Sequence, residues 1–382
     1  MKILNSLVVS LSLLSTIACV SRTPASDPVE NKPQDLAAQI KQIQTKSMMP
    51  GLQVLVTEGD RKVFEYVDGV RAVGQSLAVT SEDQWHIGSC TKPMTAFLVG
   101  QLIDQGKLKW TTTLAEIAPK GYKLHTSVQS ISVEQLLAYQ SGLADVTTDE
   151  KLWNSLFTDK LKPKVAREKL VRSILKSPVR FTAGTKTEYS NSSYLILGWI
   201  VELIKKSSWE NVTEKELFQK LGMNSCGFGP AGIQDKKVAL QPWGHHMVDG
   251  KLVALPPGPL ADNPAALGPA GTVHCSANDW RKFLKFYIGN EAVRHQFVSQ
   301  STYDKLLSNA PDGFFTYSTM GRGERPWAKG AAYFMMGNNT FNLAFVTVAP
   351  AMNRIYTINT NAGHPQVEKG TAEILQLVLA LE

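Results

Sequence analysis

Strand patterns lie at both ends of this chain, and helical patterns lie between them. Leu52, Val54 and Val56 recur at alternate positions, the chain turns at Glu58-Gly59-Asp60 and it returns over 63–67, which predicts a β-hairpin. A second strand pair is predicted near the C-terminus, over 343–348 and 354–359. We therefore expect one antiparallel sheet to which both ends of the chain contribute.

Helical periodicity predicts what surrounds this sheet. Apolar residues recur at helical spacing over 36–43, 133–139, 165–175, 193–205, 211–221 and 370–381. The predicted fold class is α+β, with the sheet and its flanking helices in one lobe over about 35–115 and 255–382, and a mostly helical lobe inserted over about 116–254. A cleft between two lobes is the expected place for a functional site.

The composition excludes several classes of protein. With 43% hydrophobic and 19% charged residues among 382, the chain can bury a sizeable core, which excludes general disorder. The net charge of +7 is mildly basic, but no long run of Lys and Arg occurs, so we expect no nucleic-acid partner. The four cysteines form no CxxC motif and indicate neither a disulfide framework nor a structural zinc site. Whether Cys226 and Cys275 pair stays open.

The N-terminal segment has the layout of an export signal. One charged residue precedes an apolar stretch, which predicts a signal peptide at 1–18 and not a membrane span. Thr16-Ile17-Ala18-Cys19 resembles a bacterial lipobox, so Cys19 is a candidate for lipidation; the alternative is an ordinary signal peptide cut nearby. The polar residues 19–34 are expected to form a flexible tether. We expect a protein of the bacterial cell envelope, periplasmic and anchored through a lipid on Cys19.

A Ser-x-x-Lys motif at Ser89 and Lys92 is the candidate nucleophile. Residues three apart lie on one face of a helix, so the Lys92 amine can reach the Ser89 hydroxyl. A serine hydroxyl needs a neighbouring base, and a buried lysine can serve because burial lowers its pKa. Gly88 permits a sharp entry into a helix expected to begin here and to end at Gly106. A second motif of this kind, Ser173–Lys176, lies in a charged amphipathic pattern and is interpreted as an exposed helix face.

The context of the first motif carries a family resemblance. Residues 86–96, His-Ile-Gly-Ser-Cys-Thr-Lys-Pro-Met-Thr-Ala, closely resemble the active-site segment of the serine β-lactamase family, which comprises class C β-lactamases, D-alanyl-D-alanine peptidases and related esterases. Residues 136–143, 189–191 and 267–276 resemble further motifs of that family in the same order. The resemblance extends from about 52 to 361 and implies a serine hydrolase that acts through an acyl-enzyme on an amide, peptide or ester.

The resemblance also implies roles for individual residues. Ser89 would be the acylated nucleophile, and Lys92 and Tyr189 would share its proton, with Tyr189 acting as a phenolate or as a relay. Asn191 would bind the amide carbonyl of the substrate and orient Lys92. The alternative for Tyr189-Ser190-Asn191 is a buried tyrosine followed by a helix cap. A generic α/β-hydrolase is a further alternative, but the G-x-S-x-G elbow is absent around Ser89.

The third family motif departs from its usual composition. It normally has Lys or His, a small residue and Gly on the strand that lines the cleft, and here Met335 takes the Lys or His position. Gly337 and the backbone N–H of Asn338 can still complete an oxyanion hole with the Ser89 N–H, because that role uses only backbone. A group that binds a substrate carboxylate is lost. A catalytically weakened or inactive binding protein of the cell envelope is therefore the alternative function.

The histidines are interpreted as structural. His245 and His246 are adjacent and do not converge on one ion, and His86 and His274 are expected to pack and hydrogen-bond beside the family segments. His364 is a candidate to reach the cleft and replace the missing cation. We expect no metal and no cofactor, and a small-molecule, peptide or ester substrate as the partner. The sequence indicates no oligomeric state.

Overall fold

The computed structural model describes residues 33–158, 160–232, 235–289, 291, 294 and 296–381. The predicted signal peptide at 1–18, Cys19 and the tether as far as residue 32 lie outside this part of the chain. The last two residues assigned to the tether belong instead to helix α2 (Pro33–Lys46), because proline is well suited to the first position of a helix. Within the described residues, no helix is both long and apolar enough to cross a membrane.

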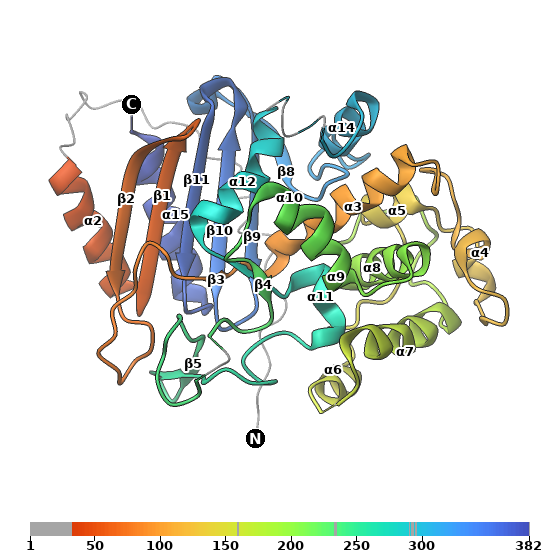
Figure 1. Ribbon diagram of the computed structural model, residues 1–382, viewed down its shortest axis with the longest axis horizontal. Helices are drawn as coiled ribbons and strands as arrows, with labels where there is room; N and C mark the ends of the chain where they lie inside the picture. The colour runs from red at the N-terminus through yellow and green to blue at the C-terminus, as the bar shows by residue number, and fades with distance from the viewer. Residues whose placement is uncertain are drawn as a thin grey trace.

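The predicted antiparallel sheet is present, and both ends of the described chain contribute to it (Figure 1). Its six strands, in spatial order, are β2 (Arg61–Gly69), β1 (Gly51–Glu58), β11 (Arg354–Thr360), β10 (Leu343–Ala349), β9 (Gly330–Asn338) and β8 (Gly321–Arg325). Val54 of β1 lies opposite Tyr66 of β2 on one side and opposite Ile358 of β11 on the other. The pairing of β1 with β11 thus joins the two predicted hairpins.

Helices pack on both faces of this sheet. α2 and α15 (Pro365–Leu379) lie against one face, and α12 (Ala277–Ile288) lies against β10 and β11 on the other (Figure 1). Consequently every residue of β10 and β11 is buried. The last helix begins five residues before the predicted 370, with Gly370 inside it. A Cβ at Gly370 would lie 2.2 Å from the Ser47 hydroxyl, so this glycine permits close packing and does not mark a helix boundary.

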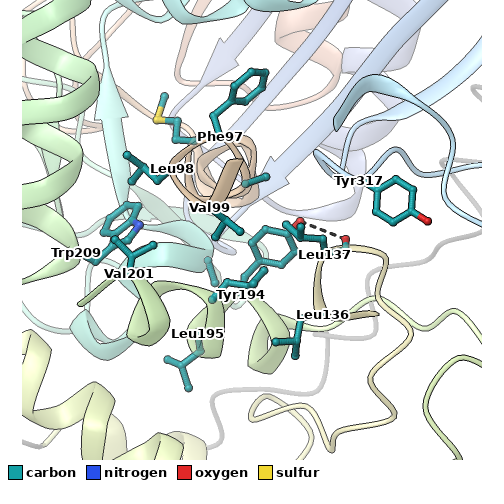
Figure 2. Close-up of a cluster of buried hydrophobic side chains, with 14 of the residues drawn as sticks. Phe97, Leu98, Val99, Leu136, Leu137, Tyr194, Leu195, Val201, Trp209 and Tyr317 are labelled. Carbon is teal, nitrogen blue, oxygen red and sulfur yellow. Dashed lines mark hydrogen bonds between the residues drawn. The ribbon is translucent and has the colours of Figure 1, made fainter. Parts of the chain in front are cut away.

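The helical lobe surrounds α3 (Lys92–Asp104), the helix that follows the candidate nucleophile. Its other helices are α4 (Leu114–Ile117), α5 (Val133–Leu137), α6 (Glu150–Leu156), α7 (Pro163–Lys176), α8 (Asn191–Lys205), α9 (Trp209–Thr213), the π-helical turn η3 (Glu214–Phe218) and α10 (Gln219–Leu221). The predicted helix at 211–221 is therefore divided among three consecutive pieces, α9, η3 and α10, and the first of them begins two residues earlier, at Trp209. α3 is buried over Lys92–Leu102, on all sides and not on one face, and Figure 2 shows Phe97, Leu98 and Val99 packed among side chains of α5, α8 and α9.

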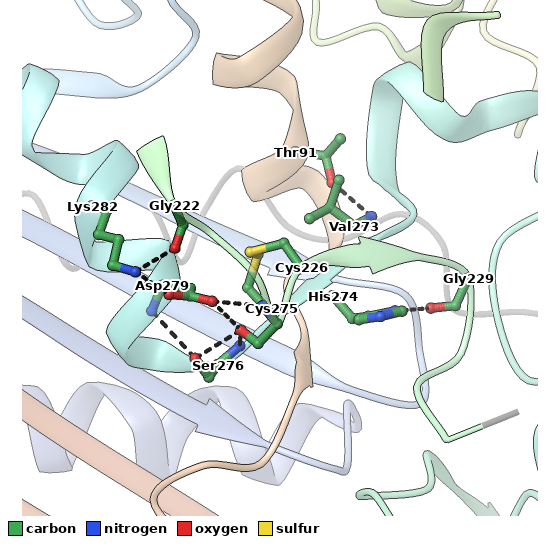
Figure 3. Close-up of a disulfide and its surroundings, with 11 residues drawn as sticks. Thr91, Gly222, Cys226, Gly229, Val273, His274, Cys275, Ser276, Asp279 and Lys282 are labelled. Carbon is green, nitrogen blue, oxygen red and sulfur yellow. Dashed lines mark hydrogen bonds and ion pairs between the residues drawn. A yellow bond between two sulfur atoms is a disulfide. The ribbon is translucent and has the colours of Figure 1, made fainter. Parts of the chain in front are cut away.

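Two smaller sheets and a disulfide complete the fold. β3 (Trp85–His86), β7 (Val273–Cys275) and β4 (Gly227–Phe228) form one sheet, and β5 (His245–Val248) pairs with β6 (Lys251–Ala254). The pairing of Cys226 with Cys275, left open by the sequence, is formed, with 49 residues of separation (Figure 3). This disulfide holds the segment before β4 against β7, next to the strand that leads into the candidate nucleophile. α14 (Gln300–Leu307) and α11 (Gly268–Gly271) pack against α3.

Candidate active site

Ser89 lies in a tight turn that presses against strand β9. It belongs to the 3₁₀ helix η1 (Gly88–Thr91), and Gly88 enters this turn with φ +50°, a conformation that favours glycine. A Cβ at Gly337 would lie 2.0 Å from the Ile87 carbonyl oxygen and 2.8 Å from the Ser89 nitrogen. A Cβ at Gly88 would lie 2.8 Å from the nitrogen of Asn338. The two glycines thus allow a contact that brings the amides of Ser89 and Asn338 to one junction, as an oxyanion hole requires.

Lys92 is positioned as a base for Ser89. Its Nζ lies 2.9 Å from Ser89 Oγ, and it also donates to Asn191 Oδ1 at 2.9 Å and to the carbonyl oxygen of Ala270 at 2.7 Å. The side chain is fully buried, and this burial lowers the pKa of Lys92 to about 7, although the nearby Asp145 carboxylate opposes the shift. Near neutral pH the amine is therefore half neutral and can accept the serine proton.

Tyr189 is the second group in contact with the nucleophile. Its hydroxyl donates to Ser89 Oγ at 2.6 Å. Burial raises the pKa of Tyr189 above its ordinary value, and the charge of Asp145 adds to the rise, whereas the hydrogen bond to Ser89 opposes it. Of the two roles predicted from the sequence, these shifts favour a protonated relay and count against a phenolate.

Asp145 organises this group of residues, although it was not among the predicted site residues. Its carboxylate accepts the backbone N–H of Asn191 in a short hydrogen bond, the Asn191 Nδ2 at 3.4 Å and the Thr147 hydroxyl at 2.7 Å. An acidic group is favourable here because the N-terminus of α8 presents free N–H groups. Asp145 thereby fixes the Asn191 amide whose oxygen receives Lys92. Its one sequence signal was its place two residues beyond the 136–143 segment.

Comparison with known proteins identifies the family to which this chain belongs. The family model described as Beta-lactamase matches residues 36–380, nearly all of the described chain. The chain belongs to the beta-lactamase family. This is a family of serine hydrolases, and its fold is the two-lobed arrangement described above. The segment resemblance at 86–96 is therefore confirmed at the level of the whole chain.

Individual relatives in this family are distant in sequence but similar in fold. Penicillin-binding protein 4 of Amycolatopsis lactamdurans is 26% identical over 337 residues, which cover 84% of this chain and 83% of that protein. The octameric penicillin-binding protein homologue from Pyrococcus abyssi superposes with a TM-score of 0.75 at 22% identity, over 91% of this chain and 78% of the other. The D-amino acid amidase from Ochrobactrum anthropi SV3 gives 0.69 at 16% identity, over 91% and 97%.

The residue predicted to stand in place of the third-motif cation has an apolar side chain in the cleft. Met335 of β9 is buried, and the Thr319 hydroxyl donates to its thioether sulfur at 3.5 Å. His364, the predicted replacement, is not among the residues that line the cleft. It caps the start of α15, and its Nε2 lies 3.5 Å from the Met48 carbonyl oxygen. That prediction was wrong, because the first turn of α15 holds His364 toward the α2–β1 connection.

The cleft itself is a cavity of about 300 Å³ between the two lobes. Ser89, Tyr189 and Asn191 are among the residues that line it. Apolar side chains also line it, and they are those of Phe314, Phe315, Phe334, Met335 and Met336. Asn338 also borders the cavity, but its side chain donates to the Gly363 carbonyl at 2.8 Å, so only its backbone is available to a substrate.

The other histidines contact protein groups. His86 pairs with Asp262 at 2.5 Å, and His274 Nδ1 lies 2.8 Å from the Gly229 carbonyl oxygen. His245 accepts the Val73 N–H at 2.9 Å, and burial lowers the pKa of this histidine to about 4. No group of three His, Cys, Asp or Glu residues in the described ranges is arranged to hold a metal ion.

Proposed function

We propose that this protein is an exported serine hydrolase that acts through an acyl-enzyme on an amide, peptide or ester. The observation that carries the proposal is the contact of one hydroxyl with two proton carriers: Ser89 Oγ lies 2.9 Å from Lys92 Nζ and 2.6 Å from the Tyr189 hydroxyl. This arrangement activates the nucleophile and leaves an acid beside it. It also distinguishes Ser89 from Ser173, which has the same motif but lies exposed on α7.

The geometry supports a balanced sequence of proton transfers. Ser89 Oγ attacks the substrate carbonyl carbon while its proton passes to neutral Lys92. The amides of Ser89 and Asn338 stabilise the oxyanion. As the bond from carbonyl carbon to nitrogen or oxygen breaks, the Tyr189 hydroxyl donates its proton to the leaving atom and recovers one from Lys92. Water then attacks the acyl-enzyme, and the same groups return the proton to Ser89 Oγ.

Similarity to named relatives favours a C–N bond among the candidate substrates. One similar fold is a D-amino acid amidase and another is a penicillin-binding protein homologue, and both names refer to amide chemistry or its ligands. The proposal includes export of the protein, for which the segment at 1–18 would be the signal. It also includes membrane anchoring through a lipid on Cys19.

One observation favours a second function. The loss of the third-motif cation at Met335 removes a group that assists proton transfer, so a binding protein without turnover is the competing proposal. The two proposals share a ligand site and differ only in whether Ser89 turns over.

A comparison of substrate turnover by the wild-type protein and by two serine variants separates these proposals. A p-nitrophenyl ester and an amino acid amide serve as substrates, with Ser89→Ala as the test and Ser173→Ala as the matched control. We expect kcat/KM to fall by at least about 10³-fold in Ser89→Ala and to stay unchanged in Ser173→Ala. Full activity in Ser89→Ala would overturn the assignment. If the wild type shows no turnover but the amino acid amide raises its unfolding temperature, the binding protein would be favoured.

A further inference from the structure

A continuous array of aromatic rings begins at the tyrosine beside the nucleophile. Ring centroids are 6.4 Å apart between Tyr189 and Phe315, 4.8 Å between Phe315 and Phe314, and 5.6 Å between Phe314 and Phe334. All four residues line the cavity, and such spacings are those of favourable edge-to-face and tilted ring pairs. Phe334 belongs to β9, and the other two phenylalanines lie in the segment between α14 and β8.

None of the side chains that line this wall is cationic, and Arg325, whose guanidinium lies 5.8 Å from the Phe334 ring centroid, is not among the lining residues. Met335 and Met336 extend the apolar surface along β9. The one cationic side chain among the lining residues is Arg180, and it forms a short ion pair with Glu188, which also binds Lys186 at 2.8 Å. A carboxylate placed against the array would lose water without gaining a cationic partner among the lining residues of this wall, which is unfavourable.

The position of Tyr189 shows which part of a substrate would meet the array. Under the proposed function, Tyr189 donates its proton to the leaving atom, so the leaving group must lie beside this hydroxyl. The Tyr189 ring is the first member of the array, and Phe315 and Phe314 follow it. A leaving group at the Tyr189 hydroxyl therefore lies at the start of the aromatic array.

We propose that Phe314, Phe315 and Phe334, with Met335 and Met336, form a leaving-group subsite for an uncharged, apolar and preferably aromatic group. The inference rests on the proposed function and narrows its substrate class to amides or esters whose released amine or alcohol carries no carboxylate. Substrates that place a carboxylate next to the labile bond are disfavoured. Thr319 contributes by engaging the Met335 sulfur and so holding that side chain against the wall.

A pair of aryl esters with one common acyl group tests this subsite. The 3-carbamoylphenyl and 3-carboxyphenyl esters have leaving groups of similar size and acidity and differ in charge. We expect the neutral ester to be preferred in kcat/KM by about 10- to 200-fold, the range that a hydrophobic pocket provides. Met335→Lys should shift this ratio toward the carboxylate by at least about tenfold, because it supplies the missing partner.

Two alanine variants show whether the array is the leaving-group side. Phe314→Ala should lower kcat/KM for the neutral aryl ester by about tenfold and lower that for the ethyl ester of the same acid by a smaller factor, because the smaller ethyl group makes less contact with the ring. Phe341→Ala is the matched control, since Phe341 is half-buried beside His246 and does not line the cavity. Equal effects of Phe314→Ala on the aryl and ethyl esters, or a preference for the carboxylate ester, would overturn the subsite.

Intact-mass detection of the acylated protein keeps the two proposals distinguishable. If Ser89 is acylated by both aryl esters without the predicted preference, the leaving-group inference fails and the proposed function stands. If neither ester acylates Ser89, the proposed function fails and the inference fails with it.

Discussion

The pH dependence of acylation follows from the burial of Lys92. Burial lowers the pKa of this lysine from 10.5 to about 7. At pH 7 about half of the Lys92 amines are then neutral, against about 0.03% for an unperturbed lysine, which is a gain of about 1,500-fold in available base. The neutral form accepts the Ser89 proton, so activity should be present above the pKa and lost as the pH falls through it.

The assay is kcat/KM for a neutral aryl ester between pH 5 and 9.5 at constant ionic strength, since this ratio reports the free enzyme. We expect a tenfold fall for each pH unit below about 7 and a plateau above it. Because burial raises the pKa of Tyr189, no loss of activity from its ionisation is expected on the plateau.

A charge variant provides the control for this profile. Asp145 raises the pKa of Lys92 through its charge, so Asp145→Asn should move the midpoint to lower pH even if it also reduces the rate. A flat profile over this range, a midpoint near the ordinary lysine value, or a midpoint that moves upward in Asp145→Asn would refute the reasoning.

Three further predictions follow from contacts elsewhere. The Cys226→Ala and Cys275→Ala double variant should lose about 4 kcal/mol of unfolding free energy in urea, the entropy of a loop with 49 residues of separation, and an unchanged midpoint would contradict this. Gly337→Ala should cut kcat/KM by at least about 100-fold, because its Cβ would lie 2.8 Å from the Ser89 nitrogen, with circular dichroism checking that the fold survives. Tyr139→Phe removes a buried hydroxyl that lies beside the Thr319 and Tyr189 hydroxyls without a hydrogen bond of normal geometry, so thermal unfolding should show about 1 kcal/mol of added stability; a loss would show that the hydroxyl is bonded to one of them.

The strands of the fold illustrate what the sequence can predict. β1, β2, β10 and β11 carry apolar patterns and were predicted as two hairpins. β8 was missed because Gly321–Arg325 contains two glycines and three charged residues, and its strand conformation depends on pairing with β9. β5 and β6 were missed as well, being only four residues each.

The candidate site shows a similar division between local and distant information. Ser89 and Lys92 are three residues apart, so one turn of backbone brings them together and the motif is readable. Tyr189 and Asn191 were found through the family resemblance. Asp145 and Thr319 were not, because their contacts with Asn191 and Met335 depend on how separate loops pack, and the types Asp and Thr are common in loops.

The most direct test of the proposed function is to trap the acyl-enzyme and locate it by peptide mass spectrometry. After brief incubation with an aryl ester or a fluorophosphonate, we expect one adduct per protein on the peptide that contains Ser89. The adduct should disappear in Ser89→Ala and persist in Ser173→Ala. An adduct on another residue, or one retained in Ser89→Ala, would contradict the account.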